Sequence, residues 1–86
     1  QEKDLVNTKM YLQTVVEKLL TLNDFSKESI KATLWPLAEE KGKGNVLWPM
    51  RFALSGKDKS PDPFIIAEIL GKEETIKRLT YAIQNI

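Results

Sequence analysis

The chain has 86 residues, of which 42% are hydrophobic and 29% are charged, and its formal net charge is +1. This length fits one small domain, and the composition is typical of a folded globular chain rather than a disordered one. The sequence has no cysteine and no histidine, which excludes disulfides, thiolate chemistry, imidazole catalysis and the usual zinc sites.

The sequence shows no membrane-spanning run, and its start does not look like a targeting segment. No apolar run approaches the roughly 18 residues that a transmembrane helix needs, and the polar start Gln1-Glu2-Lys3-Asp4 is unlike a signal peptide. Because the chain does not begin with methionine, we expect residues 1–86 to be one domain of a longer or processed protein. A cytoplasmic location is the expectation that follows.

Helical periodicity is visible from the start of the chain. The spacing of the leucines and valines between residues 4 and 22 suits a period of 3.6 residues and predicts a helix. Ser26 is a candidate N-cap, flanked by the Phe25 and Ile30 pair of a hydrophobic staple. The second helix should run to about Lys41, with a kink or division at Pro36 because proline removes a helical hydrogen bond.

Residues 41–45 form a basic, glycine-rich segment that we expect to be a loop. The short apolar stretch 46–55 predicts a helix that Gly56 closes, with a strand as the alternative. Residues 57–59 are a second charged loop.

The last third of the chain predicts two more helices. Ser60 is the expected N-cap and Pro61 the expected first residue of a helix that runs to Leu70. After Gly71, isoleucine and leucine recur at spacings of three and four between residues 73 and 86. No segment alternates as strands do, so the sequence predicts an all-α bundle of about five helices.

Positive charge gathers in the middle of the chain. Residues 1–40 carry five basic and seven acidic side chains, whereas residues 41–86 carry eight basic and five acidic ones. The basic residues between 41 and 59 form either a phosphate-facing patch or a pair of solvated loops; they are Lys41, Lys43, Arg51, Lys57 and Lys59.

The chain has only two arginines, and each allows a specific interpretation. Arg51 lies on an otherwise apolar segment, where a planar guanidinium suits either a bidentate contact to a base edge or a structural ion pair. Arg78 follows Glu74 by four residues, which predicts an exposed ion pair on the last helix.

Two tryptophans, Trp35 and Trp48, each precede a proline. Either ring could be a platform on which an unpaired base stacks. In so small a domain, packing in or against the core is the simpler interpretation of both.

Four short motifs occur in an order that resembles a known family. They are Leu47-Trp48-Pro49-Met50-Arg51-Phe52-Ala53-Leu54-Ser55-Gly56, Ser60-Pro61 with Phe64, Leu70-Gly71-Lys72-Glu73, and Arg78-Leu79 with Ala82. Together they resemble the C-terminal anticodon-binding region of bacterial-type glutamyl-tRNA synthetase, a class I aminoacyl-tRNA synthetase. The resemblance covers about residues 41–86, with Met50 and Ser55 in place of the family's usual leucine and threonine.

The resemblance implies an α-helical, non-catalytic domain that binds the anticodon loop of glutamate tRNA. The amphipathic segments supply a core of their own, so we expect a monomer. The rest of the synthetase chain would activate glutamate with ATP and Mg²⁺, so the resemblance implies no cofactor or metal for this fragment. It also implies that Arg51 contacts anticodon bases and that Ser60 and Pro61 form a corner that closes on a base. Pro63 falls at a contact position of that corner, with a side chain different from the family's.

The helix start in this corner is a poor phosphate site, because proline lacks an N–H at positions 61 and 63 and Asp62 is negative. We therefore expect the corner to meet a base. The alternative function is a helical protein-interaction domain with solvated lysine loops. A free-standing small enzyme is the third possibility, for which the sequence offers no histidine, cysteine or glycine-rich phosphate loop.

Overall fold

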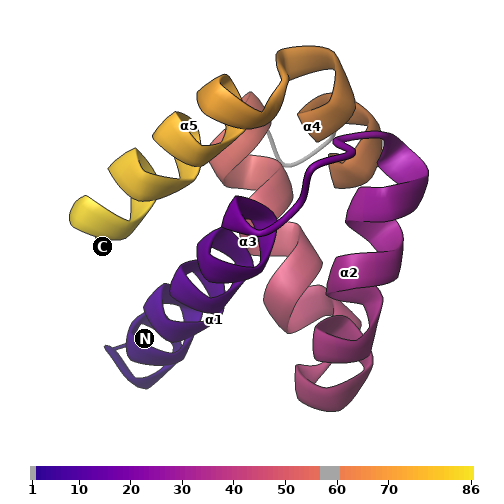
Figure 1. Ribbon diagram of the computed structural model, residues 1–86. Coiled ribbons are helices and arrows are strands. Elements are labelled where there is room, and N and C mark those ends of the chain that lie inside the picture. Colours follow the sequence, from indigo (N-terminus) through magenta and orange to yellow (C-terminus); the bar gives the residue numbers. More distant parts are fainter. Residues whose placement is uncertain (1, 57–60) are drawn as a thin grey trace.

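The computed structural model describes residues 2–56 and 61–86, with side chains described from residue 6 onward. The described residues form helices and connecting turns and contain no strand (Figure 1). The predicted all-α bundle of about five helices is confirmed. Its elements are α1 (Glu2–Leu20), α2 (Lys27–Lys41), α3 (Lys43–Ser55), α4 (Pro63–Leu70) and α5 (Lys72–Gln84).

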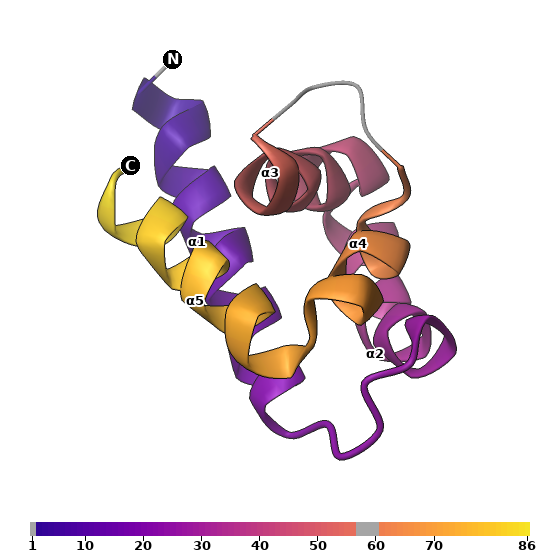
Figure 2. The same ribbon diagram turned by 90° about the horizontal axis from the view of Figure 1, so that it is seen from above.

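Helix α3 holds the bundle together. It packs against each of the other four helices, with α1 and α5 on one side and α2 and α4 on the other. Figure 2 shows α1 and α5 lying side by side in opposite directions, and they form the most extensive helix pair. The position of every other helix is therefore tied to α3.

Many of the side chains that the apolar periodicity selects are buried, although Leu20 is 55% exposed. On α1, Leu12, Val15 and Leu19 are at most 1% exposed. The predicted N-cap of α2 is also confirmed, because the Ser26 hydroxyl accepts a hydrogen bond from the Ser29 amide at 3.2 Å. The rest of the core consists of Ile30, Leu34, Leu37, Ala38, Val46, Met50, Leu54, Phe64, Ala67 and Leu79.

The loop predicted for residues 41–45 is wrong. Helix α3 begins at Lys43, so Gly42 alone separates it from α2. Gly42 turns the chain with φ of +100°, and a Cβ there would lie 2.7 Å from the side-chain nitrogen Nδ2 of Asn45. Asn45 in turn donates to the carbonyl of Lys41 at 2.8 Å. A single glycine therefore makes the connection that a five-residue loop was expected to make.

The predicted division of α2 at Pro36 does not occur, because the helix runs unbroken from Lys27 to Lys41. Pro36 and Ala32 both lie on the exposed face of α2. The carbonyl of Ala32, which loses its helical donor to the proline, can therefore bond to water.

The predicted start of α4 is wrong by two residues. The helix begins at Pro63 rather than Pro61, and Asp62 is its N-cap in place of Ser60. The Asp62 carboxylate accepts a hydrogen bond from the Phe64 amide at 2.7 Å. The chemistry of the prediction, an oxygen cap followed by proline, is preserved at the later position.

The later helices cap the ends of the earlier ones. The Lys72 ammonium on α5 donates to the carbonyls of Leu20 and Leu22, at 3.0 and 2.8 Å, at the end of α1. Glu68 on α4 accepts from the Lys27 amide at the start of α2 at 3.0 Å. These contacts satisfy terminal backbone groups that a helix cannot satisfy by itself.

Candidate nucleic-acid interface

Helix α3 exposes two aromatic rings on the face opposite its core residues. Trp48 is 52% and Phe52 is 48% exposed, and their rings stack with centroids 5.8 Å apart and an angle of 27° between planes. The prediction of core packing is therefore wrong for Trp48. It is confirmed for Trp35, which is half-buried against the core and meets Phe64 edge-on at 6.4 Å.

The sequence carried a signal that could have identified Trp48. Val46, Met50 and Leu54 recur every four residues and are all buried. A residue two positions from such a stripe lies about 200° around the helix, on the opposite face. Trp48 and Phe52 both occupy such positions.

The exposed rings border a hollow of about 580 Å³ between α1, α3 and α5. Tyr11 and Leu12 contribute from α1, and Ala82 from α5. Polar groups of Asn7, Thr8 and Asn45 also line it. The aromatic face of α3 is thus open to a flat, partly apolar ligand group rather than covered by the fold.

Arg51 lies on the same helix and is half-buried. Its Nε atom is buried and has no hydrogen-bond partner among the residues that the structure describes. In residues 2–56 and 61–86 the one ion pair joins Arg78 to Glu74 at 2.8 Å, which confirms the predicted pair of α5 and leaves Arg51 outside any ion pair. A buried donor without a partner costs about 1–3 kcal/mol, and the Arg51 side chain as a whole is only half-buried.

The backbone beneath Arg51 is held in place. Met50 and Leu54, on either side of it in the helix, are buried in the core. The Ser55 hydroxyl donates to the carbonyl of Arg51 at 2.8 Å. The guanidinium is therefore presented from a rigid element, as base discrimination requires.

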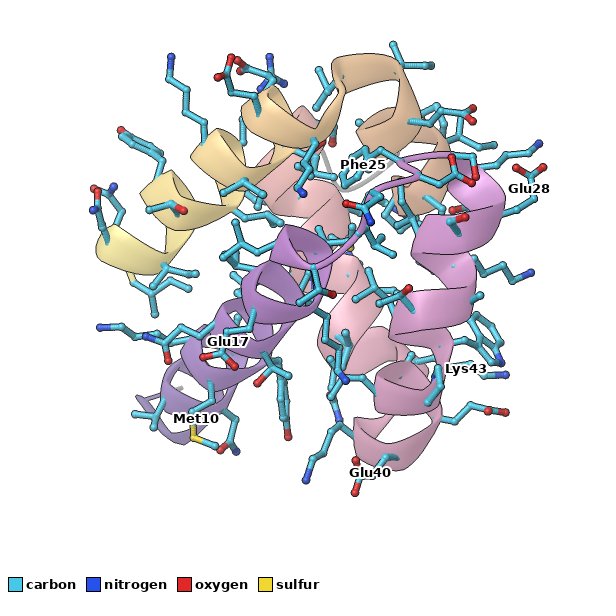
Figure 3. The ribbon with its side chains drawn as sticks, in the orientation of Figure 1. Met10, Glu17, Phe25, Glu28, Glu40 and Lys43 are labelled. Atoms are coloured by element: carbon cyan, nitrogen blue, oxygen red, sulfur yellow. The ribbon has the colours of Figure 1, made fainter. Side chains whose placement is uncertain are left out.

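Two of the four predicted phosphate-facing lysines lie in the described structure. Lys41 ends α2 and Lys43 begins α3, and both are exposed. The Lys43 ammonium lies 4.8 Å from the centroid of the Trp35 ring. Figure 3 labels Lys43 at the surface of the bundle. The helical rise places Lys43 about 12 Å along α3 from Arg51. Lys57 and Lys59 lie outside the described residues.

The predicted corner residues differ in exposure. Pro61 is exposed, whereas Pro63 is buried at the start of α4, and Ser60 lies outside the described residues. The Asp62 carboxylate engages the Phe64 amide, so an anion at this helix start would meet both a negative charge and an occupied donor. The geometry agrees with the expectation that the corner is unsuited to phosphate.

The described part of the chain contains neither a metal cluster nor a membrane-spanning helix. No three acidic side chains come together there as a metal site would require. None of its helices is both long and apolar enough to cross a bilayer.

Comparison with known proteins identifies the family. The pattern of the "Anticodon binding domain" family matches residues 1–83. A glutamate–tRNA ligase of Clostridium kluyveri is 37% identical over an alignment of 86 positions, which covers 96% of this chain and 18% of the relative. A glutamate–tRNA ligase of Clostridium botulinum is 41% identical over 83 residues, covering 93% of this chain and 17% of the relative.

A solved structure agrees with these relatives. The crystal structure of a glutamate tRNA ligase from Elizabethkingia meningosepticum, in complex with its amino acid, superposes with a TM-score of 0.82 at 42% identity. The match covers 90% of this chain and 16% of that one. The chain thus spans less than a fifth of the length of the proteins it matches, and it belongs to the anticodon-binding domain family found in glutamate–tRNA ligases.

Proposed function

We propose that this chain binds the anticodon loop of glutamate tRNA as the C-terminal domain of a glutamate–tRNA ligase. Family membership supports the kind of ligand. The observation that carries the proposal is Arg51, whose buried Nε has no partner although the surrounding helix is held rigidly. The side chain as a whole is only half-buried, and we assign an anticodon base as its acceptor.

The chemistry of the α3 surface suits a single-stranded loop. Proteins read RNA sequence where bases are unstacked, through arginine forks and flat apolar surfaces. Arg51 supplies the fork, and the stacked rings of Trp48 and Phe52 supply exposed aromatic surface on the same helix. Lys41 and Lys43 add positive charge for phosphates at the start of α3.

Each predicted site residue has a role in this proposal. Arg51 reads a base, and Ser60 and Pro61 close on a base at the corner before α4. Pro63 holds that corner in place, because its ring is buried and cannot be offered to RNA. Lys41, Lys43, Lys57 and Lys59 neutralise phosphates without reading sequence.

The ligation of glutamate to tRNA is assigned to the rest of the protein. ATP and Mg²⁺ would supply the activation of glutamate there. The described residues do not fit a metal, since no three acidic side chains converge, and we assign no step of that reaction to them. We also propose that the protein is cytoplasmic and monomeric.

Substitution of Arg51 in the full-length protein tests the proposal. We expect Arg51→Ala to lower kcat/KM for glutamate tRNA. The loss should correspond to about 1–3 kcal/mol of transition-state stabilisation, the value of one bidentate base contact. Arg51→Lys should recover little, because an ammonium keeps the charge and loses the fork. Replacing the base that Arg51 reads should then harm the variant much less than the wild type.

Lys77→Ala, an exposed substitution on α5, is the matched control and should leave kcat/KM unchanged. A large stability loss in Arg51→Ala with intact anticodon preference would contradict the reading role. A gel shift with glutamate tRNA and an unrelated tRNA tests the alternative function. Equal failure to bind both would favour a protein-interaction domain.

A further inference from the structure

Arg78 of α5 joins that helix to the end of α3. Its Nη1 donates to the carbonyl of Leu54 at 2.6 Å, and its Nε donates to the Glu74 carboxylate at 2.8 Å. Leu54 is the second-last residue of α3, so its carbonyl lies among those that a helix leaves without a donor. Arg78 supplies that donor from another element.

Helix α3 has no basic residue in its own last turn. The positive charge that favours a helix C-terminus therefore comes from α5. A charge-assisted bond of this kind is stronger than a neutral one, and it acts where helices usually fray.

The turn that Arg78 holds is the one that follows Arg51. The Ser55 hydroxyl donates to the Arg51 carbonyl, and the Gly56 amide donates to the Phe52 carbonyl at 2.7 Å. Gly56 then turns the chain out of the helix with φ of +74°. Opening of this turn would release the bonds to the carbonyls of Arg51 and Phe52 together.

Glu74 orients the guanidinium. It lies one turn before Arg78 on α5 and binds Nε, which leaves Nη1 directed at Leu54. The hydrogen bond from Arg78 is the main cause that lowers the pKa of Glu74, so the carboxylate is ionised at neutral pH. A lysine has a single charged nitrogen and cannot reproduce this planar, two-sided arrangement.

We infer that Glu74 and Arg78 are positioning residues that fix the last turn of α3 and thereby the direction of the Arg51 guanidinium. This inference rests on the proposed function. It means that discrimination between anticodon bases depends on the Glu74–Arg78 pair, although neither residue of the pair contacts the base. Affinity for the RNA backbone does not depend on the pair.

Two measurements on the full-length protein test the inference, with Arg78→Ala, Arg78→Lys and Glu74→Gln as variants and Lys77→Ala as the control. The first is hydrogen exchange of the amides of residues 54–56. Loss of one charge-assisted bond predicts exchange about tenfold faster in Arg78→Ala. Arg78→Lys and Glu74→Gln should show smaller increases, and the control none.

The second measurement is the ratio of kcat/KM for glutamate tRNA to that for the same tRNA with the base read by Arg51 replaced. We expect Arg78→Ala to lower this ratio by about tenfold, as coupled neighbours do, while activity with the replaced-base tRNA stays near the wild-type value. A merely structural role would lower both activities alike.

Unchanged exchange at residues 54–56 in Arg78→Ala would overturn the positioning role. Faster exchange in Arg78→Ala with an unchanged kcat/KM ratio would overturn it as well. In both cases the proposed function would stand, provided that the wild type discriminates between the two tRNAs. Absence of discrimination in the wild type would overturn the proposed function and the positioning role with it.

Discussion

The ammonium of Lys72 lies 2.8 Å from the carbonyl oxygen of Leu22 and 3.0 Å from that of Leu20. Fifty residues separate Lys72 from Leu22 in the chain, so the contact joins the last helix to the segment that leaves the first. Three ammonium donors on one flexible stem suit two neighbouring carbonyls. Lys72 thus performs for α1 the capping that Arg78 performs for α3.

Lys72→Met should destabilise the domain by about 1–2 kcal/mol, because it removes two charge-assisted bonds and a favourable charge at a helix end. Urea unfolding of the chain, followed by circular dichroism at 222 nm, measures this change. Lys77→Met on the same helix is the control and should stay within about 0.5 kcal/mol of wild type. Equal stability of the two variants would show that the Lys72 contacts contribute nothing.

Trp48→Ala should affect RNA binding more than folding. The ring is half exposed and stacks only on Phe52 among aromatic side chains of the described residues, so stability should fall by less than about 1.5 kcal/mol. Affinity for the anticodon stem-loop should fall by about 1–3 kcal/mol, the usual contribution of one base stack. Tyr81→Ala, which removes an exposed ring from α5, should leave affinity intact; a similar loss in both variants would argue against stacking at Trp48.

Salt should weaken binding through the lysines. If about three phosphates are neutralised, log K plotted against log salt should have a slope near −2, using roughly −0.7 for each phosphate of a single strand. Lys43→Ala should make the slope shallower by about 0.7 and weaken all tRNAs alike. Lys27→Ala, at the other end of α2 from Lys41, is the control, and an affinity independent of salt would exclude the phosphate role.

Acid should destabilise the turn between α1 and α2 through Asp24. Hydrogen bonds from the Ser29 hydroxyl, and then from Ser26, hold the pKa of Asp24 below its usual 3.8. Because the folded pKa is the lower one, the stabilisation is present above 3.8 and is lost as the pH falls through the folded pKa.

The Asp24→Asn variant should therefore lose less stability than the wild type when the pH falls from neutral to below 3.8. Urea unfolding at the two pH values measures the difference, with Glu40→Gln, an exposed site on α2, as the control. A wild-type pH dependence in Asp24→Asn would exclude this carboxylate as its source.

Helices were predictable where local signals agreed. The periodicity of α1, the Ser26 cap and the glycines after α3 and α4 each follow from sequence spacing and backbone preference. The start of α4 was not predictable in this way, because Ser60 and Asp62 both offer an oxygen before a proline. In the structure Asp62 is the N-cap, and the two residues that follow it, Pro63 and Phe64, are buried. Burial of this kind is a tertiary effect that local spacing does not reveal.

The candidate site was predictable as residue types and not as an arrangement. Spacing and resemblance selected Arg51, but whether a carboxylate would pair with it depends on which helices meet α3. The α2–α3 junction shows the same limit, since the Gly42 turn depends on the Asn45 side chain reaching back to Lys41. The exposure of Trp48 differs from the prediction because small domains usually bury tryptophan, although a position opposite Val46 and Met50 indicates the exposed face.

The pairing of α1 with α5 has a consequence for synthesis on the ribosome. Of the five described helices, α1 emerges first, with its core face of Leu12, Val15 and Leu19, whereas α5, which lies along it, follows the other four. Until Lys72 and the residues after it leave the exit tunnel, that face and the carbonyls of Leu20 and Leu22 lack their final partners. The domain therefore completes its fold only near the end of translation of this segment, and nascent chains stalled before α5 should expose apolar surface that chaperones bind.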